Sequence, residues 1–155
     1  MANRHSWLVA AVIALTALAS CNGKKVYDSF VHNPITGWER NDTVAFKVPA
    51  VKAEGTYGMV LKLRTDNSFP FTGVVLIVNQ TIIPANKMYS DTLTCSLTDR
   101  RGHSLGKGVN LYQHEFRIAD RQLSAGDSVY VTVHHNMMRE ILPGIADVGL
   151  TVNKE

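Results

Sequence analysis

Beyond residue 26, apolar and polar residues alternate along most of the chain, and no helical period of three to four residues recurs. Alternation places every second side chain on the same face of an extended strand, so one face can pack on a core while the other meets water. Clusters of Gly, Pro, Asn and Asp separate the alternating stretches, as expected for turns. The predicted strands cover residues 43–48, 57–64, 73–81, 89–97, 112–118, 129–133 and 146–152.

Two segments depart from simple alternation. The stretch from Val74 to Val78 is apolar at every position, which predicts a central strand covered on both faces. Residues 137–142 form the one stretch in which a helical turn is predicted. Seven or eight strands with turns between them and no long helix predict an all-β fold, an antiparallel β-sandwich of the immunoglobulin-like or jelly-roll type.

The first 20 residues have the composition of a signal peptide. Arg4 gives a short positive region, and the run from Trp7 to Leu18 is apolar except for Thr16. A helix of this length rises about 1.5 Å per residue and reaches roughly 18 Å, well short of a hydrocarbon core about 30 Å thick. Residues 1–20 are therefore predicted to be a lipoprotein signal peptide that is removed on export, rather than a membrane span.

Leu18, Ala19, Ser20 and Cys21 end this region with the pattern of a bacterial lipobox. The two small residues let the signal peptidase fit an extended segment, and the cysteine sulfur forms the thioether to diacylglycerol. We predict lipidation of Cys21; the alternatives are cleavage near Ala19 with ordinary secretion, or an uncleaved anchor. Two or three acyl chains make attachment to a membrane effectively permanent.

The mature chain then divides into a lipidated cysteine with a short tether, residues 21–25, and a single β-sandwich domain, residues 26–155. Removing 20 of the 155 residues leaves 135, which is enough for one domain with a real core. Asn22 stands where, in several bacteria, an aspartate holds lipoproteins at the inner membrane. Lys24-Lys25 is unlike the acidic stretch that marks export to the cell surface. These features favour the outer membrane, with the domain facing the periplasm.

The charge balance argues against nucleic acid as a partner. The chain has 16 Lys+Arg and 13 Asp+Glu, a net charge of +3 that falls to +2 when Arg4 leaves with the signal peptide. The basic residues are scattered apart from two pairs, so no basic stripe is present that could follow a phosphate backbone. With Cys21 lipidated, Cys95 has no cysteine partner, and its strand position predicts a small buried core residue.

No catalytic set is predicted. No nucleophile elbow of the Gly-x-Ser-x-Gly type is expected, and no glycine-rich phosphate loop precedes a helix. The acidic residues lie mostly in turns without an evident pair for glycoside hydrolysis. Asp147, inside an apolar strand, is predicted to accept hydrogen bonds from backbone amides. His134 and His135 stand beside Met137 and Met138, a composition that fits copper or zinc, but adjacent strand residues point to opposite faces. We therefore predict neither an enzyme, nor a cofactor, nor a metal site.

Seven segments of the mature chain carry a family pattern. They are Tyr27-Asp28, Gly37-Trp38, Leu61-Lys62-Leu63-Arg64, Phe69-Pro70-Phe71, Asp91-Thr92-Leu93, Leu105-Gly106-Lys107-Gly108 and residues 142–149. In order and spacing they resemble the gliding motility lipoprotein GldH family of Bacteroidetes, although residues 69–71 stand where tyrosines are common in that family. The resemblance implies an accessory, non-catalytic lipoprotein of the gliding and type 9 secretion machinery, with other envelope proteins as its partners.

The aromatic residues allow two interpretations. Phe69 and Phe71 flank Pro70 in a predicted turn, which predicts a protruding loop that docks a protein partner. Alternatively, an open face presenting Trp38, Tyr57, Phe69 and Phe71 would stack on sugar rings, and the protein would be a glycan-binding module of the envelope. Tyr57 occupies an alternating strand position, however, and is itself predicted to be buried.

Thr43, Thr92 and Ser128 each follow an aspartate and precede an apolar residue. This spelling is similar to the O-glycosylation signature of exported Bacteroidetes proteins. The dipeptides Asp-Thr and Asp-Ser also simply begin β-strands, so both interpretations stay open at each position.

Overall fold

The computed structural model describes residues 25–155, which form ten β-strands. The strands are β1 (Lys25–His32), β2 (Trp38–Glu39), β3 (Val44–Val48), β4 (Gly55–Asp66), β5 (Gly73–Ile83), β6 (Lys87–Ser96), β7 (Leu111–Leu123), β8 (Ser128–His135), β9 (Ile141–Leu142) and β10 (Ile145–Lys154). Within residues 25–155, no helix is long and apolar enough to cross a membrane. The predicted signal peptide and lipobox, including Cys21, lie outside the described residues.

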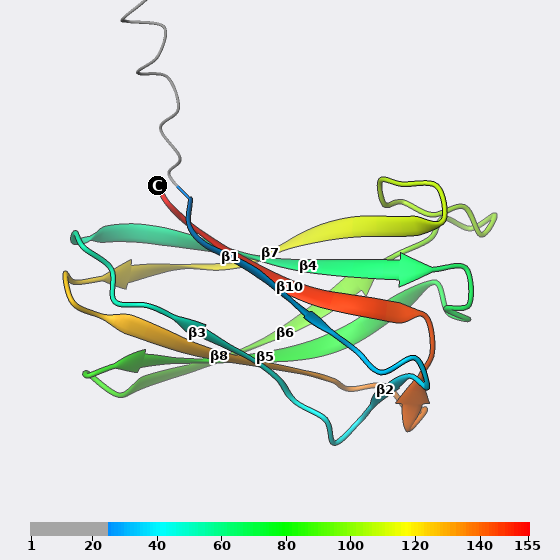
Figure 1. Ribbon diagram of the computed structural model, residues 1–155, viewed down its shortest axis with the longest axis horizontal. Helices are drawn as coiled ribbons and strands as arrows, with labels where there is room; N and C mark the ends of the chain where they lie inside the picture. The colour runs from blue at the N-terminus through cyan, green and yellow to red at the C-terminus, as the bar shows by residue number, and fades with distance from the viewer. Residues whose placement is uncertain (1–24) are drawn as a thin grey trace, which may run out of the picture.

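Eight of these strands form two stacked four-stranded sheets (Figure 1). Sheet I has the order β1-β10-β4-β7 and sheet II the order β3-β8-β5-β6, and all of the pairings are antiparallel. A separate two-stranded ladder joins β2 to β9. The predicted all-β sandwich is confirmed, and the two short strands, of two residues each, bring the count from eight to ten.

The core lies between the two sheets and is filled by the inward-facing half of each alternating strand. Leu61 and Leu150 project from sheet I, and Leu76 and Val131 project from sheet II; all four are buried. Each fully buried aliphatic side chain contributes about 1.5–3 kcal/mol by leaving water. The two-residue periodicity of the sequence is therefore the direct cause of the layered fold.

The central strand of sheet II differs from its prediction. β5 lies between β8 and β6 as expected for a central strand, but its burial alternates. Val74, Leu76 and Val78 are buried, whereas Val75 and Ile77 face outward and are only half-buried. No second layer covers the outer face of sheet II within residues 25–155, so the prediction of a strand covered on both faces is wrong.

The predicted helical turn at residues 137–142 is also wrong. The chain bends after β8 and then forms β9, in which Leu142 pairs with Trp38 of β2. Met137 is held by two local contacts: its backbone N–H donates to Nδ1 of His135 at 3.4 Å, and its Sδ accepts the N–H of Val75 at 3.4 Å. These contacts and the β2–β9 pairing outcompete a helix of barely one turn.

The two ends of the sandwich differ: the domain begins at one end, and two long loops lie at the other. At the tether end, Lys25 at the start of β1 pairs with Asn153 near the end of β10. At the opposite end, which we call the loop end, residues 67–72 join β4 to β5 and residues 97–110 join β6 to β7 (Figure 1). The loop end therefore lies a full strand length away from the point where the expected tether meets the domain.

Candidate functional site

The β4–β5 loop at the loop end contains the predicted docking residues. Asp66 fixes its first turn, because Oδ1 accepts hydrogen bonds from the backbone N–H and the hydroxyl of Ser68 at 2.8 and 2.6 Å. Phe69 is half-buried against the core, while Phe71 is 37% exposed, and the two rings meet edge to face at a centroid distance of 5.9 Å. Phe69 thus anchors the loop and Phe71 is its accessible ring, so a docking role remains a prediction.

Gly144, in the turn between β9 and β10, packs against this loop. Gly144 has a positive φ of 83°, and a side chain there would collide with the backbone and Cβ of Phe69. Its carbonyl oxygen accepts the N–H of Asp66 at 2.9 Å. The β9–β10 turn and the β4–β5 loop are therefore packed against each other at a point where only glycine fits.

The β6–β7 loop is organised by one carboxylate. Oδ1 of Asp99 accepts the backbone N–H groups of Arg101 and His103 at 2.8 and 2.9 Å, and Oδ2 lies 3.1 Å from Nδ1 of His103. The hydrogen bond from the His103 backbone is the main cause that lowers the pKa of Asp99. The tightened turn presents Arg100 and Arg101 to solvent.

The same loop contains the Gly-x-Ser-x-Gly motif, and the expectation that this motif is absent is wrong. Gly102-His103-Ser104-Leu105-Gly106 has the Gly-x-Ser-x-Gly spelling of a nucleophile elbow, which requires a strand, a sharp turn and a helix. Here the segment connects two strands, Ser104 forms a bridge with Thr98, and its Oγ accepts the N–H of Gly106 at 3.1 Å. The spelling is present without the geometry of the elbow.

Residues 104–108 then run along β7 and separate two open cavities. Lys107 and Gln113 exchange backbone hydrogen bonds of 3.0 and 2.9 Å. Leu105 and Lys107 line one cavity of about 330 Å³, and Ser104, Gly106 and Gly108 line another of about 430 Å³. Successive side chains of an extended segment point to opposite sides, so alternate residues of 104–108 line the two cavities.

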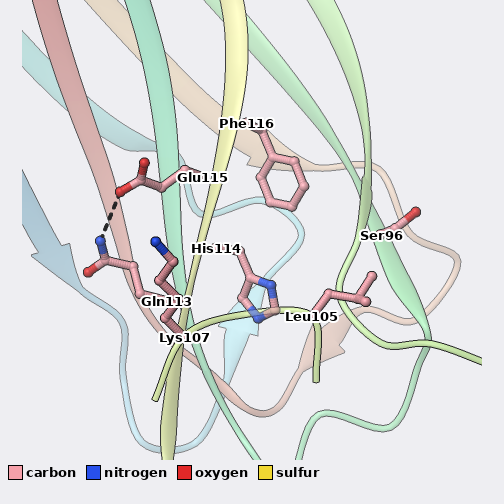
Figure 2. Close-up of a pocket in the computed structure, with 7 residues that line it drawn as sticks. All are labelled: Ser96, Leu105, Lys107, Gln113, His114, Glu115 and Phe116. Atoms are coloured by element: carbon pink, nitrogen blue, oxygen red, sulfur yellow. Dashed lines mark hydrogen bonds between the residues drawn. The ribbon is translucent and has the colours of Figure 1, made fainter. Parts of the chain in front are cut away.

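The first cavity, which we call the slot, opens between the edge strands of the two sheets. Figure 2 shows the rings of His114 and Phe116 on the side of β7 that faces Ser96 of β6, while Gln113 and Glu115 point to the other side. His114 is buried, its Nε2 lies 3.0 Å from the hydroxyl of Thr65, and its ring stacks on Phe116. Burial lowers the pKa of His114.

A second polar region covers the outer face of sheet I, where Asp28 joins three strands. The Asp28 carboxylate accepts hydrogen bonds from Lys25 at 2.8 Å, from the nearly buried Lys62 at 3.0 Å, and from the hydroxyl of Thr151 at 2.8 Å. The bond from Lys25 is the largest cause that holds the pKa of Asp28 well below its usual range.

Beside it, the Phe30 ring covers Gly149, where an added Cβ would come within 2.6 Å of the ring. The guanidinium of Arg64 lies over the ring at 3.8 Å from its centroid, a cation–π contact. Asp147 then binds Nδ1 of His32 at 2.8 Å and lies 3.7 Å from Arg64. The prediction that Asp147 accepts backbone amides is wrong, because it faces outward opposite His32 in the β1–β10 register.

Five of the seven segments that carried the family pattern lie in these two regions. Tyr27-Asp28, Leu61-Lys62-Leu63-Arg64 and residues 146–149 supply the network on sheet I. Phe69-Pro70-Phe71 and Leu105-Gly106-Lys107-Gly108 supply the loop end. Sequence order alone does not reveal this convergence, because Lys62 and Thr151 are 34 and 123 positions away from Asp28.

The aromatic platform proposed for a glycan-binding module does not exist. Trp38 is 0% exposed, its Nε1 donates to the Asp42 carbonyl at 2.9 Å, and its ring packs edge-on against His135. Tyr57 is 1% exposed and its hydroxyl donates to the Ala53 carbonyl, as its predicted burial requires. Neither ring can stack on a sugar, so the open-face interpretation that included them is wrong.

His135 and Cys95 are both part of the buried core. His135 is buried with Nε2 3.1 Å from the Trp38 carbonyl, whereas His134 projects from the other face of β8. The two imidazoles therefore cannot bind one ion together. Cys95 is buried, which confirms the predicted core position, and burial raises the pKa of its thiol to about 12.

The predicted O-glycosylation sites differ in accessibility. Thr43 and Thr92 are exposed, whereas Ser128 is half-buried at the start of β8. Modification of all three remains a prediction, and the intact mass of the natively purified protein, compared with that of the lipidated polypeptide, tests it.

The fold and these regions define a class: a single β-sandwich that combines an internally paired charged sheet face with an exposed, loop-built end. The model of the family described as GldH lipoprotein matches residues 25–152, and the chain belongs to this family. The predicted family membership is confirmed. The chain is accordingly a lipoprotein, anchored by lipid in the cell envelope.

Two relatives support the assignment along almost their full length. A gliding motility lipoprotein GldH homolog of Christiangramia forsetii is 24% identical over 152 residues, covering 92% of each chain. The gliding motility lipoprotein GldH of Flavobacterium johnsoniae is 28% identical over 151 residues, covering 93% of this chain and 94% of its own. Among solved structures, a family 35 carbohydrate-binding module from Clostridium thermocellum is 13% identical with a TM-score of 0.40, covering 79% of this chain and 86% of that one. A likeness this weak carries no argument about a ligand.

Proposed function

We propose that this chain is an accessory lipoprotein of the gliding motility and type 9 secretion apparatus of Bacteroidetes, and that it acts by contacts with envelope proteins rather than by catalysis. Membership of the GldH lipoprotein family supports this role, as does the relative from Flavobacterium johnsoniae, which aligns over more than nine-tenths of both chains. No covalent step is required of the chain, because a structural component contributes through binding energy alone.

Anchoring follows from the lipobox. The signal peptide, residues 1–20, is removed and Cys21 carries the lipid, with the outer membrane as the site of attachment and the periplasm as the compartment. Four residues from Cys21 to Lys25 reach at most about 14 Å, which keeps the tether end of the sandwich near the bilayer. The loop end is then free to meet proteins of the apparatus.

Apolar side chains are exposed at the loop end, and they are the main support for a role in binding other proteins. Leu105 is 59% exposed and Val109 is 81% exposed, and Phe71 and Leu111 are also accessible. They accompany two cavities in the same region. Three of the four lie within residues 105–111, and exposed apolar residues that lie together, rather than scattered singly, favour a protein interaction site.

Crosslinking in living cells tests this proposal, with the full-length lipidated protein as bait. Phe71→Ser should reduce recovery of secretion-machine subunits several-fold while leaving the midpoint of thermal unfolding unchanged. Ile83→Ser at the tether end is the matched control, since Ile83 is 47% exposed, and it should leave recovery intact. Equal recovery with both variants, or no motor or secretion subunit among the crosslinked proteins, contradicts the proposal.

Lipidation is tested separately by feeding cells labelled palmitate. The wild-type protein should carry the label in the membrane fraction, and Cys21→Ser should lose both the label and the membrane attachment. Unlabelled wild-type protein would contradict the anchor.

A further inference from the structure

We propose that the free edge of β6, next to the slot and the basic β6–β7 loop, binds an extended, acidic segment of a partner protein by strand addition. The inference deepens the proposed function, on which it rests, by assigning the chemistry of the partner. Three observations support the proposal. The edge of β6 is unprotected, the slot adjoins it, and the β6–β7 loop beside them carries positive charge without an ion-pair partner.

The sandwich has four edge strands, and three of them are protected. β1 has an irregular register at its start and carries outward charges, β3 is only five residues long, and β7 contains a bulge opposite Met59 and Val60. β7 is also paired at Gln113 by Lys107. Such devices keep edges from pairing with foreign strands. β6 pairs with β5 without a register shift and, in the described part of the chain, with no other strand.

The backbone of β6 points its hydrogen-bonding groups outward at the positions that matter. Val75 of β5 directs its carbonyl toward Asn136, which donates at 2.8 Å, and its N–H toward Met137. Both groups therefore face away from β6. Thr94 is the register partner of Val75, so in an antiparallel ladder its own N–H and C=O face away from β5, toward the open edge.

The accessible part of this edge is the stretch from Thr92 to Ser96. Toward the tether end, Arg121 of β7 crosses to β6, where it binds Asp91 at 2.7 Å and stacks over Tyr89. Beyond that clamp, no residue from Thr92 to Ser96 carries a charge, and the outward side chains are hydroxyl groups. Five residues of neutral, regular edge strand match the length of a short added strand.

The slot lies where the inward side chains of an added strand would project. It has a volume of about 330 Å³ and is lined by Ser96, Leu105 and Phe116, among others (Figure 2). A side chain the size of valine or leucine suits such an opening. Backbone pairing supplies affinity in this mode of recognition, and pockets for alternate side chains supply selectivity.

Charge selects the partner. Asp99 is tied to its own loop by two backbone N–H groups and His103. Arg100 and Arg101 are exposed, and neither forms an ion pair with another described residue. The end of the β6 edge beside this loop is therefore positive and attracts acidic side chains.

The same charges argue against a second copy of this chain as the occupant. In an antiparallel pairing of two β6 strands, the basic loop of one copy would lie beside Lys87 at the start of β6 in the other. In a parallel pairing, the two basic loops would lie beside each other. Both arrangements place like charges together, so an acidic segment of a different protein fits better.

Two fluorescent peptides test the proposal, acetyl-Asp-Asp-Val-Thr-Val-Thr-Val-amide and its reversed sequence. The acids lie at the end that meets the basic loop in antiparallel and parallel pairing, respectively. Binding to the full-length lipidated protein in detergent is followed by fluorescence anisotropy. One of the two peptides should bind, and its affinity should fall several-fold between about 50 and about 300 mM salt. A peptide with Lys-Lys in place of Asp-Asp should bind at least fivefold more weakly.

Variants of the protein distinguish strand addition from nonspecific binding. Thr94→Pro removes the outward N–H on an edge strand, where proline is tolerated, and should weaken binding about tenfold, whereas Thr94→Ala keeps the N–H and should not. The pair Arg100→Ser and Arg101→Ser should weaken binding and flatten its salt dependence. If Thr94→Pro unfolds, peptides N-methylated at alternate amides test the same hydrogen bonds on the unaltered protein and should fail to bind.

Three results would overturn the proposal: no binding by either peptide, equal binding after N-methylation, or a self-associated wild-type protein that Thr94→Pro converts to monomer in sedimentation. The last result would assign the edge to a second copy. Crosslinking with Phe71→Ser is independent of all three, so continued recovery of secretion-machine subunits would leave the proposed function standing while the edge proposal fails.

Discussion

The outer faces of the two sheets use their polar side chains in opposite ways. Sheet I carries charges that pair with one another, along one strand as Asp28 does with Lys25 and across strands as Asp28 does with Lys62. Sheet II is nearly neutral, and Lys47 is the single Lys, Arg, Asp or Glu among its outward-facing strand residues. The others include Ala45, Val75, Ile77, Asn79, Thr81, Ser90, Thr92, Thr94, Tyr130, Thr132 and His134. The charged side chains of sheet I are therefore paired within the domain, whereas the outer face of sheet II has few charged groups to pair.

This difference indicates where stability and where binding reside. The network on sheet I joins β1, β10 and β4, so it fixes the strand that connects the domain to its tether. Paired charges that are already satisfied gain little from a new partner. Sheet II ends in the unprotected β6 edge and can accept new hydrogen bonds without losing old ones. Changes on sheet I should therefore lower stability, and equivalent changes on sheet II should not.

The largest expected effect is that of Gly149→Val on sheet I. The new side chain would occupy the position of the Phe30 ring, which cannot move without leaving Arg64. Overpacking of this kind costs about 3 kcal/mol in the free energy of unfolding, measured by denaturant titration. A loss below about 1 kcal/mol would show that Phe30 moves freely and that the stacked arrangement is not a fixed surface.

Asp28→Ala should follow, with a loss of about 2 kcal/mol, because it leaves Lys62 nearly buried without its carboxylate. The partial exposure of Asp28 keeps the loss below that for a fully buried pair. The double variant Asp28→Ala with Lys62→Met should recover most of the stability in the same titration. No recovery would mean that the carboxylate acts through Thr151 or Lys25 instead.

A smaller effect should come from pH through His114. Its folded-state pKa is lowered by burial, so the folded form holds the neutral ring while the unfolded chain takes up a proton below about pH 6.5. Stability is then complete above pH 6.5 and is lost as pH falls toward the folded pKa, by at most about 1.4 kcal/mol at pH 5.5. His114→Gln should show a shallower decline between pH 7 and 5.5; an unchanged slope would assign the decline to other groups.

The smallest effect should be that of Thr132→Val on sheet II. Thr132 faces outward between Ala45 and Asn79, and valine keeps the β-branched shape that suits a strand. The free energy of unfolding should change by less than about 0.5 kcal/mol. A loss comparable to that of Gly149→Val would erase the distinction between the two faces.

Strands were predictable from the sequence wherever one face of a sheet is buried. In β3 and β8 every second residue is apolar, as around Phe46 and Val131, and burial follows that spacing directly. Three strands were missed: β1, whose side chains do not alternate between buried and exposed, and β2 and β9, because two residues cannot show a period. The helical turn was predicted wrongly in the same region, where the β2–β9 pairing depends on residues about a hundred positions apart.

The regions of chemical interest were less predictable. An aromatic side chain in a sequence does not reveal whether it faces inward, and Trp38 proved to close the core. Asp147 was placed with backbone amides because its partners, His32 and Arg64, come from other strands. Phe69-Pro70-Phe71 was located in a loop correctly, since a proline between turn residues is a local signal. Cross-strand partners require a register that sequence does not supply.

The pairing of β1 with β10 determines how the domain carries mechanical load. A pull between the lipid anchor and a partner held at the loop end enters the fold at Lys25 and runs parallel to β1, whose register with β10 extends to His32. The rungs of that ladder are then strained together in shear instead of opening one after another like a zipper. A first strand attached in this orientation suits a lipid-anchored domain that is pulled away from its membrane.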